Sequence, residues 1–328
     1  MKSQNRSVFL SCLAALAIMS GWSWQARADD YPVKPIRWIV PYPGGSTADI
    51  IARKLASVVT VKMGASIIVD NKPGASGIIG TAEVAKSPPN GYTLLYTVAD
   101  PLIASSIMAA SVPYDPLRDF TFLTKIQSSS GLFLIINPAS TATSLKEFID
   151  KARRGRVTYG SYGPGSFPQI IMEQFALEAN VKFEEVAYRG PPPAIQDLIG
   201  NQISATFASV VNTKLAAKSG VRPIASVGKT RSPAFPDIPT FLELGFSSEV
   251  LQTPIWSGFF GPANLPRDVI KKNIEAFHSA LRDPSMVKFG EDLAANFLTM
   301  SPEEFSAEFR REHAAVTALL RKLGLAVR

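Results

Sequence analysis

Cysteine is almost absent from this chain of 328 residues, which contains a single one, Cys12. Cys12 lies in an expected signal peptide, so the mature chain would have no thiol and therefore no disulfide and no thiolate metal site. Histidine is nearly as scarce, because only His278 and His313 occur, both in expected C-terminal helices and away from every glycine-rich loop. Since a serine nucleophile needs a base within reach, this distribution argues against nucleophilic catalysis. We expect no metal site.

The glycine-rich segments also lack the spacing of well-known cofactor and esterase motifs. Residues 73–80 contain G-x-x-G-x-x-G, whereas dinucleotide-binding loops have G-x-G-x-x-G. Residues 160–163 read Gly-Ser-Tyr-Gly, which differs from the G-x-S-x-G of esterases. We therefore expect no cofactor, and a hydrolase of small esters or amides is the alternative from a different functional class.

Long hydrophobic runs are missing as well. No segment approaches the ~20 apolar residues that a membrane-spanning helix needs. Residues 1–28 have the pattern of a signal peptide: Lys2 and Arg6 precede an apolar run at 8–19, and Ala26-Arg27-Ala28 forms a small-x-small cleavage site. The sequence therefore predicts cleavage near Asp29 and export to the periplasm as a soluble protein without a thiol.

The charge balance is mildly basic. The chain has 34 basic and 27 acidic residues, and the signal peptide carries three of the basic ones and no acid. The mature charge is therefore 31 minus 27, or +4. Runs of lysine and arginine that indicate nucleic-acid binding are absent. A small positive excess is compatible with an anionic ligand.

Strand-like apolar runs alternate with helix-periodic segments along the whole chain. About 300 mature residues exceed what one hydrophobic core usually serves, so two lobes are expected. The alternation predicts an α/β fold with largely parallel sheets, which bind ligands at the carboxyl ends of their strands. The expected strands are 36–40, 66–69, 93–98, 132–137, 156–160, 183–188, 204–208, 221–227 and 255–261, and the clearest helices are 47–63, 167–179, 267–282 and one from 301.

A glycine-rich loop connects the first expected strand to the first helix. Ser46 and Asp49 have the spacing of a capping box at the start of that helix. Helix N-termini present free backbone N–H groups and the positive end of the helix dipole, so this loop predicts an anion-binding site. The residues expected to contribute are Tyr42, Gly44, Gly45, Ser46, Thr47 and Asp49.

A second loop, at residues 159–169, repeats this arrangement in the other expected lobe. Ser166 and Gln169 again have capping-box spacing, and Pro168 is tolerated in the first helical turn. Two such helix starts facing each other across a cleft would bind a carboxylate. The simpler interpretation is that Ser46 and Ser166 only cap their own helices, and the two roles are compatible. The residues expected to contribute here are Ser161, Gly163, Gly165 and Ser166.

Motifs along most of the chain carry a family resemblance. They are YPVKPIRWIVPYPGGSTAD at 31–49, DNKPGASG at 70–77, NGYTLL at 90–95, YRG at 188–190, FPDIPT at 235–240, WSGFFGP at 256–262 and SPEEF at 301–305. In this order they resemble the substrate-binding proteins of tripartite tricarboxylate transporters, the Bug (Bordetella uptake gene) receptors. The resemblance extends over roughly residues 31–325.

This resemblance implies a two-lobed periplasmic binding-protein fold, type II-like, with two crossing strands and a central ligand cleft. We place lobe 1 at residues 29–127 plus 256–328 and lobe 2 at 128–255. The implied function is a solute receptor that binds a small organic carboxylate and delivers it to the membrane permease subunits of a tripartite transporter. Presentation of the ligand to a sensor kinase is a second role that the sequence does not separate from delivery.

The resemblance also suggests further residues around the cleft. Ser76 would lie in a third wall, and Arg189 could pair with a second carboxylate of the ligand, although a solvated surface arginine is an equal alternative. Ala187 and Ser204 depart from the proline and aspartate that the family usually has. The additional candidates are Ser76, Ala99, Asp100, Tyr188, Arg189, Ser209 and Val210.

The identity of the carboxylate stays open at the level of sequence. Tricarboxylates, dicarboxylates, amino acids and aromatic acids all suit two helix N-termini that face each other. Aromatic residues near the loops, among them Tyr42, Tyr162, Phe167 and Tyr188, leave room for a flat acid but are equally suited to packing between the lobes.

Overall fold

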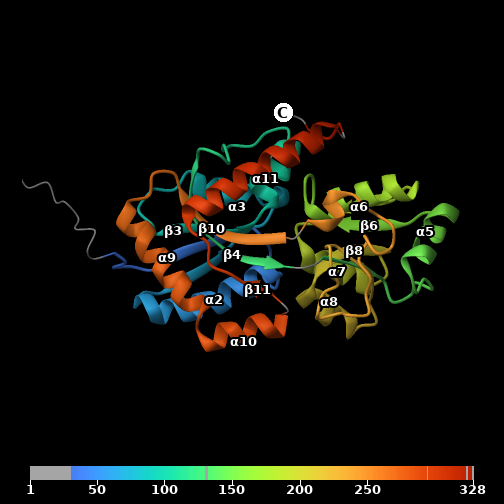
Figure 1. Cartoon of the computed structure of the whole chain (residues 1–328), viewed down its shortest axis with the longest axis horizontal. Coiled ribbons are helices and arrows are strands. Elements are labelled where there is room, and N and C mark those ends of the chain that lie inside the picture. The colour runs from blue at the N-terminus through green and yellow to red at the C-terminus, as the bar shows by residue number, and fades with distance from the viewer. Residues whose placement is uncertain (1–30, 130–131, 254, 294, 323, 327–328) are drawn as a thin grey trace, which may run out of the picture. The chain divides into compact units, whose positions relative to one another are not determined.

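The computed structural model describes residues 31–129, 132–253, 255–293, 295–322 and 324–326 (Figure 1). The expected signal peptide, its cleavage site and Cys12 lie outside these ranges. Within them, no helix combines the length and the apolar character that crossing a membrane requires.

Among the described residues, the larger of two sheets has the strand order β11-β4-β10-β3-β1-β2. Its strands are β1 (Ile36–Val40), β2 (Ile67–Asn71), β3 (Thr93–Val98), β4 (Phe120–Ser129), β10 (Ile255–Pro262) and β11 (Asn296–Phe297). β1 pairs in parallel with β2 and β3, whereas β10 is antiparallel to β3 and β4.

The smaller sheet has the order β7-β6-β8-β5-β9 in the described part of the chain. Its strands are β5 (Leu132–Ile136), β6 (Thr158–Ser161), β7 (Glu184–Ala187), β8 (Ala205–Ser209) and β9 (Arg222–Ser226). β6 pairs in parallel with β7 and β8, and β5 is antiparallel to β8 and β9.

The expectation of largely parallel sheets is wrong, because both sheets are mixed. The parallel strands β1, β3, β6 and β8 come from strand-helix-strand units, as the alternation predicted. β5 and β10 instead follow a passage of the chain from one sheet to the other. Such a strand begins at the side where the parallel strands end, so it runs against them.

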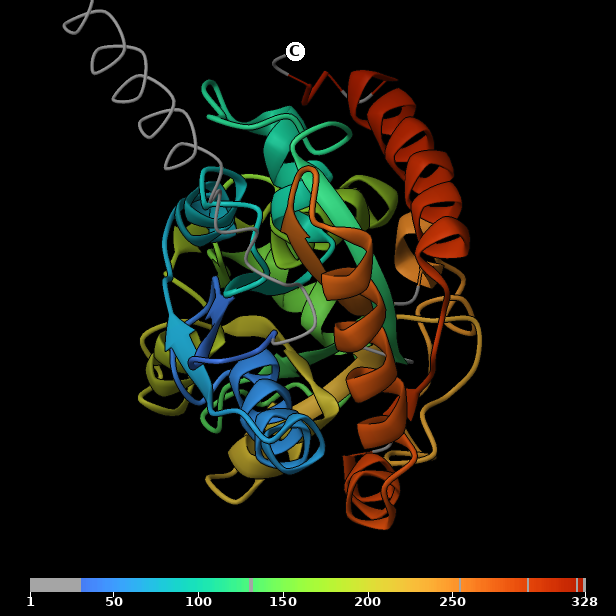
Figure 2. The ribbon, with the colours of Figure 1, turned by 90° about the vertical axis from the view of Figure 1, so that its left-hand side faces the viewer.

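Helices flank each sheet, as Figure 1 shows for α2, α9 and α11 beside the larger sheet and α5 to α8 with the smaller one. The α-helices are α2 (Thr47–Met63), α3 (Ile78–Ala85), α4 (Ala104–Met108), α5 (Leu145–Arg154), α6 (Phe167–Ala179), α7 (Pro191–Ile199), α8 (Val210–Ala217), α9 (Arg267–Leu281), α10 (Pro284–Leu293) and α11 (Pro302–Lys322). Short 3₁₀ helices are η2 (Ala75–Gly77), η3 (Asp100–Leu102) and η4 (Glu249–Gln252). Figure 2 shows α2 and α9, which pack against each other, in front of the larger sheet.

The nine expected strands are all confirmed, with ends that shift by up to two residues. The helices expected at 47–63 and 167–179 are confirmed at both ends. Strand β11 and helices α4, α5, α7, α8 and α10 were not among the expected elements, and β4 was expected only as a crossing near residues 125–131. The expected lobe boundary at 127/128 falls within β4, and the one at 255/256 falls within β10, as expected for crossing strands. The boundary residues themselves stay a prediction.

Separate hydrophobic clusters support the two sheets. α11 packs on β4, and Phe305 and Phe309 are buried against Phe122 and Phe260 of the larger sheet. The smaller sheet has its own cluster, in which Phe175 of α6 stacks on further aromatic rings. Each sheet therefore buries its own apolar surface, which is the physical basis of a two-lobed fold.

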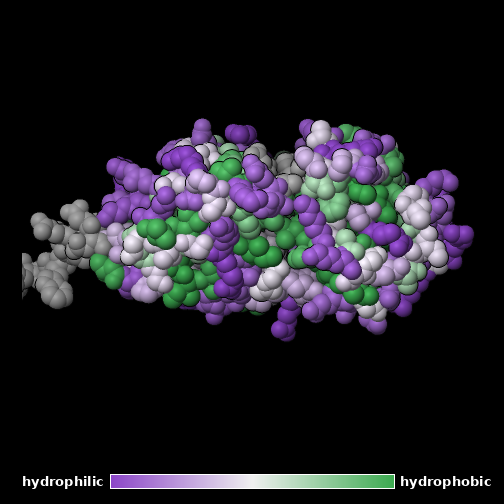
Figure 3. Space-filling model, turned by 90° about the horizontal axis from the view of Figure 1, so that it is seen from below, coloured by the Kyte–Doolittle hydropathy of each residue, from purple (hydrophilic) through white to green (hydrophobic). Residues whose placement is uncertain are grey.

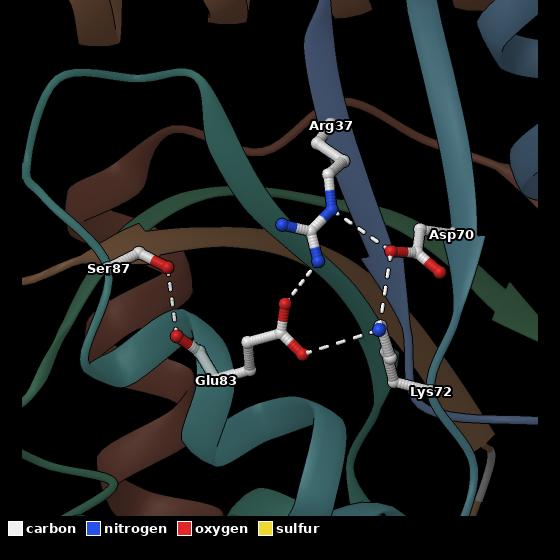
Figure 4. Close-up of polar contacts among 5 residues, drawn as sticks. All are labelled: Arg37, Asp70, Lys72, Glu83 and Ser87. Atoms are coloured by element: carbon white, nitrogen blue, oxygen red, sulfur yellow. Dashed lines mark hydrogen bonds and ion pairs between the residues drawn. The ribbon is translucent and has the colours of Figure 1, made fainter.

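An ion-pair network ties β1, β2 and α3 together at the outer part of the larger sheet (Figure 4). Arg37 of β1 contacts both Asp70 of β2, with 3.0 Å between Nε and Oδ2, and Glu83 of α3. Lys72 Nζ lies 3.7 Å from Asp70 Oδ2 and 3.9 Å from Glu83 Oε2. The Ser87 hydroxyl donates to the Glu83 carbonyl at 2.8 Å. These side chains are about one-third exposed, so the network is a partly solvated support for the sheet.

Figure 3 shows one face of the molecule, on which hydrophobic surface is divided by hydrophilic side chains. Exposed apolar side chains on the helices at the bottom of Figure 1 are Val61 of α2, Leu215 of α8 and Val287 of α10. Scattered exposed apolar side chains are normal on folded proteins. We therefore assign no site to this face.

Candidate ligand-binding site

A cavity of about 110 Å³ lies where residues of both sheets and their helices meet, and we refer to it as the central cavity. The first residues of α2 and α8 line it, together with the start of α6, parts of β3 and β10, and aromatic side chains. This volume accommodates several water molecules and therefore a small molecule. The aromatic residues in its wall are Tyr42, Tyr96, Tyr162, Phe167 and Trp256.

The start of α2 has the predicted serine cap, while the acid at N3 accepts from the residue before the N-cap and not from the N-cap itself. Ser46 is the N-cap, and its hydroxyl accepts a hydrogen bond from Asp49 N at 3.3 Å. Asp49 Oδ2 accepts from Gly45 N at 2.9 Å, and Asp49 Oδ1 pairs with Arg53 Nε at 2.8 Å. Asp49 thus stabilises the loop and does not line the cavity. The backbone at Thr47, which does line it, belongs to the helix turn whose N–H groups have no partner inside the helix.

The start of α8 is the second helix N-terminus at the cavity. Ser209 ends β8 and caps α8 by accepting from Asn212 N at 3.4 Å. Its hydroxyl also lies 2.6 Å from Thr47 Oγ1, so the starts of α2 and α8 touch. Val210 and Asn212 line the cavity beside it. The sequence paired α2 with α6, whose first residues also line the cavity, and missed α8, although the spacing Ser209-x-x-Asn212 directly after a strand was a detectable cap signal.

Ser166 does not cap α6, which corrects the simpler interpretation of its role. Its hydroxyl accepts from Tyr162 N at 3.1 Å and makes no hydrogen bond to the helix. The chain turns back at Gly163, whose φ is +98°, and this turn carries Tyr162 N to the Ser166 side chain. Gln169 completes its half of the box by accepting from Gly165 N at 2.8 Å.

The first N–H of α6 has a partner from the other sheet. Phe167 N donates to Asp100 Oδ2 at 3.0 Å, and Asp100 begins η3 directly after β3. Asp100 is 5% exposed, and its Oδ1 is buried without a hydrogen-bond partner among the described residues. Burial raises its pKa to about 7, and the nearby charge of Glu312 acts in the same direction.

The glycines of the 159–169 loop allow a close approach to chain segments of the larger lobe. A Cβ on Gly165 would lie 2.4 Å from Ser105 Cα, and one on Gly163 would lie 2.8 Å from Ser76 Oγ. The Ser76 hydroxyl donates to the Tyr162 carbonyl at 3.1 Å. We expected these glycines to admit a ligand to the backbone, but the atoms that they admit belong to η2 and α4.

Three further candidates have partners or surroundings away from the cavity. Ser161 is fully buried, donates to Glu185 and accepts from Gly163 N at 3.1 Å. The Tyr188 hydroxyl donates to Asp197 Oδ2 at 2.7 Å. Arg189 is exposed and has no hydrogen bond or ion pair within the described ranges, which matches the alternative of a surface arginine.

The central cavity therefore brings together only part of the predicted set. The candidates that line it are Tyr42, Ser46, Thr47, Asp100, Ser209 and Val210. The candidates that do not are Gly44, Gly45, Asp49, Ser76, Ala99, Ser161, Gly163, Gly165, Ser166, Tyr188 and Arg189. Contact of any of them with a ligand stays a prediction.

Comparison with known proteins identifies the family. A sequence profile described as "Tripartite tricarboxylate transporter family receptor" matches residues 51–325. The chain belongs to this receptor family. The receptor is 30% identical to protein BugT of Bordetella pertussis over 304 residues, which cover 92% of each chain. It is also 30% identical over 306 residues to the "UPF0065 protein in tcbD-tcbE intergenic region" of Pseudomonas sp., covering 91% and 89% of the two chains.

Solved structures agree with this assignment. The "Structure of periplasmic binding protein BugD" matches the receptor with a TM-score of 0.85 at 26% identity, over 90% of this chain and 99% of that one. The structure "R. palustris Rpa4515 with adipate" matches with a TM-score of 0.85 at 25% identity, over the same shares. The resemblance to Bug receptors and the two-lobed periplasmic binding-protein fold are thereby confirmed.

Sequence reasoning missed the polar residues of the receptor's crossing strands. Ser257 of β10 donates to Gln127 Oε1 of β4 at 3.1 Å, and its hydroxyl lies 2.9 Å from Tyr96 OH. Gln127, Tyr96 and Ser257 all line the central cavity. Polar side chains inside otherwise apolar strands were the available signal, because buried polar groups need partners.

Proposed function

We propose that this receptor binds a small organic carboxylate in the central cavity. The observation that carries the proposal is the meeting of two helix N-termini there, joined by the contact of Thr47 with Ser209. The capping hydroxyls bond within their own helices, which leaves neighbouring backbone N–H groups available to an anion. The chain is a protein of a solute-receptor family, and a solved relative is described as a complex with adipate.

The cavity wall supports an acid with an apolar body. Its aromatic and aliphatic side chains surround a few polar groups, which is the usual composition of a small-molecule site. Backbone N–H groups and bridging water would then provide most polar contacts, because Arg189 lies outside the cavity.

Closure of the two lobes is part of this proposal, with lobe 1 at 29–127 plus 256–328 and lobe 2 at 128–255. Contacts of Ser76 with Tyr162 and of Asp100 with Phe167 join the two segments. A ligand that adds further contacts at this place would favour the closed state. Small-angle scattering should give a smaller radius of gyration with a saturating carboxylate, and an unchanged profile would contradict closure.

Thermal-shift screening tests carboxylate binding directly, since a ligand of the folded state raises the melting temperature. Each carboxylate in the panel is paired with its primary amide and its methyl ester. At least one carboxylate should stabilise the protein, whereas its two neutral analogues should not. Equal stabilisation by a neutral analogue would contradict an anion site at the helix N-termini.

The same proposal includes export through a cleaved signal peptide at 1–28 and delivery of the ligand to the permease subunits of a tripartite transporter. It also includes presentation of the ligand to a sensor kinase. Cell fractionation and N-terminal sequencing of the mature protein test export. The alternative of a periplasmic hydrolase predicts turnover on a panel of esters and amides, whereas a receptor binds without forming product. Neither His278 nor His313 lines the central cavity in the described structure.

A further inference from the structure

Of the two carboxylate oxygens of Asp100, one accepts a hydrogen bond and the other does not. Oδ2 accepts from Phe167 N, while Oδ1 is buried and has no partner in the described part of the chain. Asp100 also lines the central cavity, together with the start of α6. A buried polar atom without a hydrogen bond is costly, and such atoms in native structures usually have a bound partner or a functional role.

The surroundings of Asp100 provide no counter-charge. No ion pair involves it in the described residues, and the charged group that acts on it is Glu312, which is itself an acid. Tyr42 and Tyr162 are its aromatic neighbours in the cavity wall, and the Tyr162 hydroxyl already donates to the Phe207 carbonyl. The Tyr42 hydroxyl is buried without a hydrogen-bond partner of its own, so no donor among the described residues reaches Oδ1, and the central cavity is where a ligand can supply one.

We propose that Asp100 is a specificity-determining residue that accepts a hydrogen bond from the ligand, and that the ligand carries an ammonium or hydroxyl donor besides its carboxylate. The inference rests on the proposed function, because it places the donor in the same cavity as the helix N-termini. The anionic end of the ligand would lie at α2 and α8, and its donor at Asp100. Simple carboxylic acids without a donor would leave Oδ1 unpaired and bind more weakly.

The competing account assigns Asp100 to structure alone. It also lines a smaller cavity of about 50 Å³ with Glu312, where one water molecule could satisfy Oδ1. In that account Asp100 only holds Phe167 N at the start of α6, and a donor on the ligand brings no gain in affinity. The two accounts therefore differ in the discrimination between ligands, and not in the stability of the fold.

Isothermal titration of ligand trios at about pH 8, where the Asp100 carboxyl is ionised, separates them. Each trio keeps one carbon skeleton and varies the substituent next to a carboxylate: succinate, aspartate and malate; adipate, 2-aminoadipate and 2-hydroxyadipate; 3-phenylpropionate, phenylalanine and 3-phenyllactate. In the trio that binds, we expect the amino or the hydroxy acid to bind about tenfold to a hundredfold more tightly than the plain acid, as for a hydrogen bond to a charged group. The preferred substituent then distinguishes an ammonium from a hydroxyl donor.

Asp100→Asn is the matched variant. Its Oδ1 can still accept from Phe167 N, while its amide group now presents a donor where the free carboxylate oxygen was. The preference within the trio should disappear or reverse in Asp100→Asn. Asp70→Asn, which changes an aspartate of the network in Figure 4, should leave the preference unchanged.

Equal affinities within every trio, or a preference that survives Asp100→Asn, would overturn the inference. In both cases the plain carboxylate still binds, so the proposed function stands and only the role of Asp100 falls. If no trio and no member of the thermal-shift panel binds, the proposed function fails and the inference fails with it.

Discussion

At the scale of single residues, Gly165 shows how the backbone conformation of one position supports contact between two lobes. Its φ is +75°, and a Cβ there would lie 2.4 Å from Ser105 Cα. We expect Gly165→Ala to cost about 1–2 kcal/mol of stability through its left-handed conformation. Because the clash also hinders the close approach to α4, we expect carboxylate affinity to fall by about tenfold or more. Chemical denaturation and titration calorimetry measure the two effects.

Gly64 provides the control for that prediction. It has a φ of +65° at the end of α2, and nothing lies within 4 Å of an added Cβ. Gly64→Ala should therefore lose only the stability that its left-handed conformation costs, which is less than the loss in Gly165→Ala, and keep full affinity. If both variants keep full affinity, the 159–169 loop has no part in closure around the ligand.

Arg37 is a second residue with a testable contribution. It joins Asp70 and Glu83, but its side chain is 37% exposed, so solvent weakens both ion pairs. We expect Arg37→Met to lower the free energy of unfolding by about 0.5–1 kcal/mol. The exposed pair of Arg156 with Glu184 is the comparison, and Arg156→Met should have no measurable effect in the same urea titration. Equal losses would show that the network in Figure 4 adds nothing beyond a single surface pair.

At the scale of elements, α6 starts differently from α2. Ser46 caps α2, whereas Ser166 holds the buried Tyr162 N and leaves the first N–H of α6 to Asp100. Ser166→Ala should therefore cost about 1–3 kcal/mol, because a buried N–H loses its acceptor. Ser144→Ala removes an ordinary cap at α5 and should cost about 1 kcal/mol. Hydrogen exchange should become faster at Tyr162 in the first variant, and unchanged exchange there would contradict the assigned bond.

At the scale of the whole molecule, Asp100 predicts a pH dependence of stability without ligand. Burial raises its pKa from 3.8 to about 7, so the folded protein keeps a proton that the unfolded chain has released between these values. Stability should therefore fall as the pH rises from about 4 to about 7. Burial lowers the pKa of His278 and His313, which has the opposite effect in the acid range.

The difference between the wild type and Asp100→Asn isolates this contribution. Urea titrations at several pH values between 4.5 and 7.5 should show the advantage of the wild type shrinking as the pH rises, because asparagine does not titrate. A difference that stays constant over this range would mean that Asp100 titrates in the folded protein as it does in the unfolded chain.

The sequence by itself determined the local elements of this receptor. The bounds of α2 and α6 and the ends of β1 and β3 followed from hydrophobic periodicity, caps and turn residues, which depend on neighbours a few positions apart. The two-lobed fold was implied by the resemblance of its motifs to the Bug receptors and not by these local patterns. The cap of α2 by Ser46 is local, and the structure confirms it, while Asp49 accepts from Gly45 N.

Only the tertiary structure decided which of these elements meet. Thr47 and Ser209 are 162 positions apart, and Asp100 and Phe167 are 67 apart. Spacing along the chain holds no information on such pairs, because they depend on how two sheets and their helices pack. For the same reason the sequence paired α2 with α6 alone, whereas the starts of α2, α6 and α8 all line the central cavity. The sequence also did not show that the sheets are mixed, because the direction of a strand depends on where the chain passes from one lobe to the other.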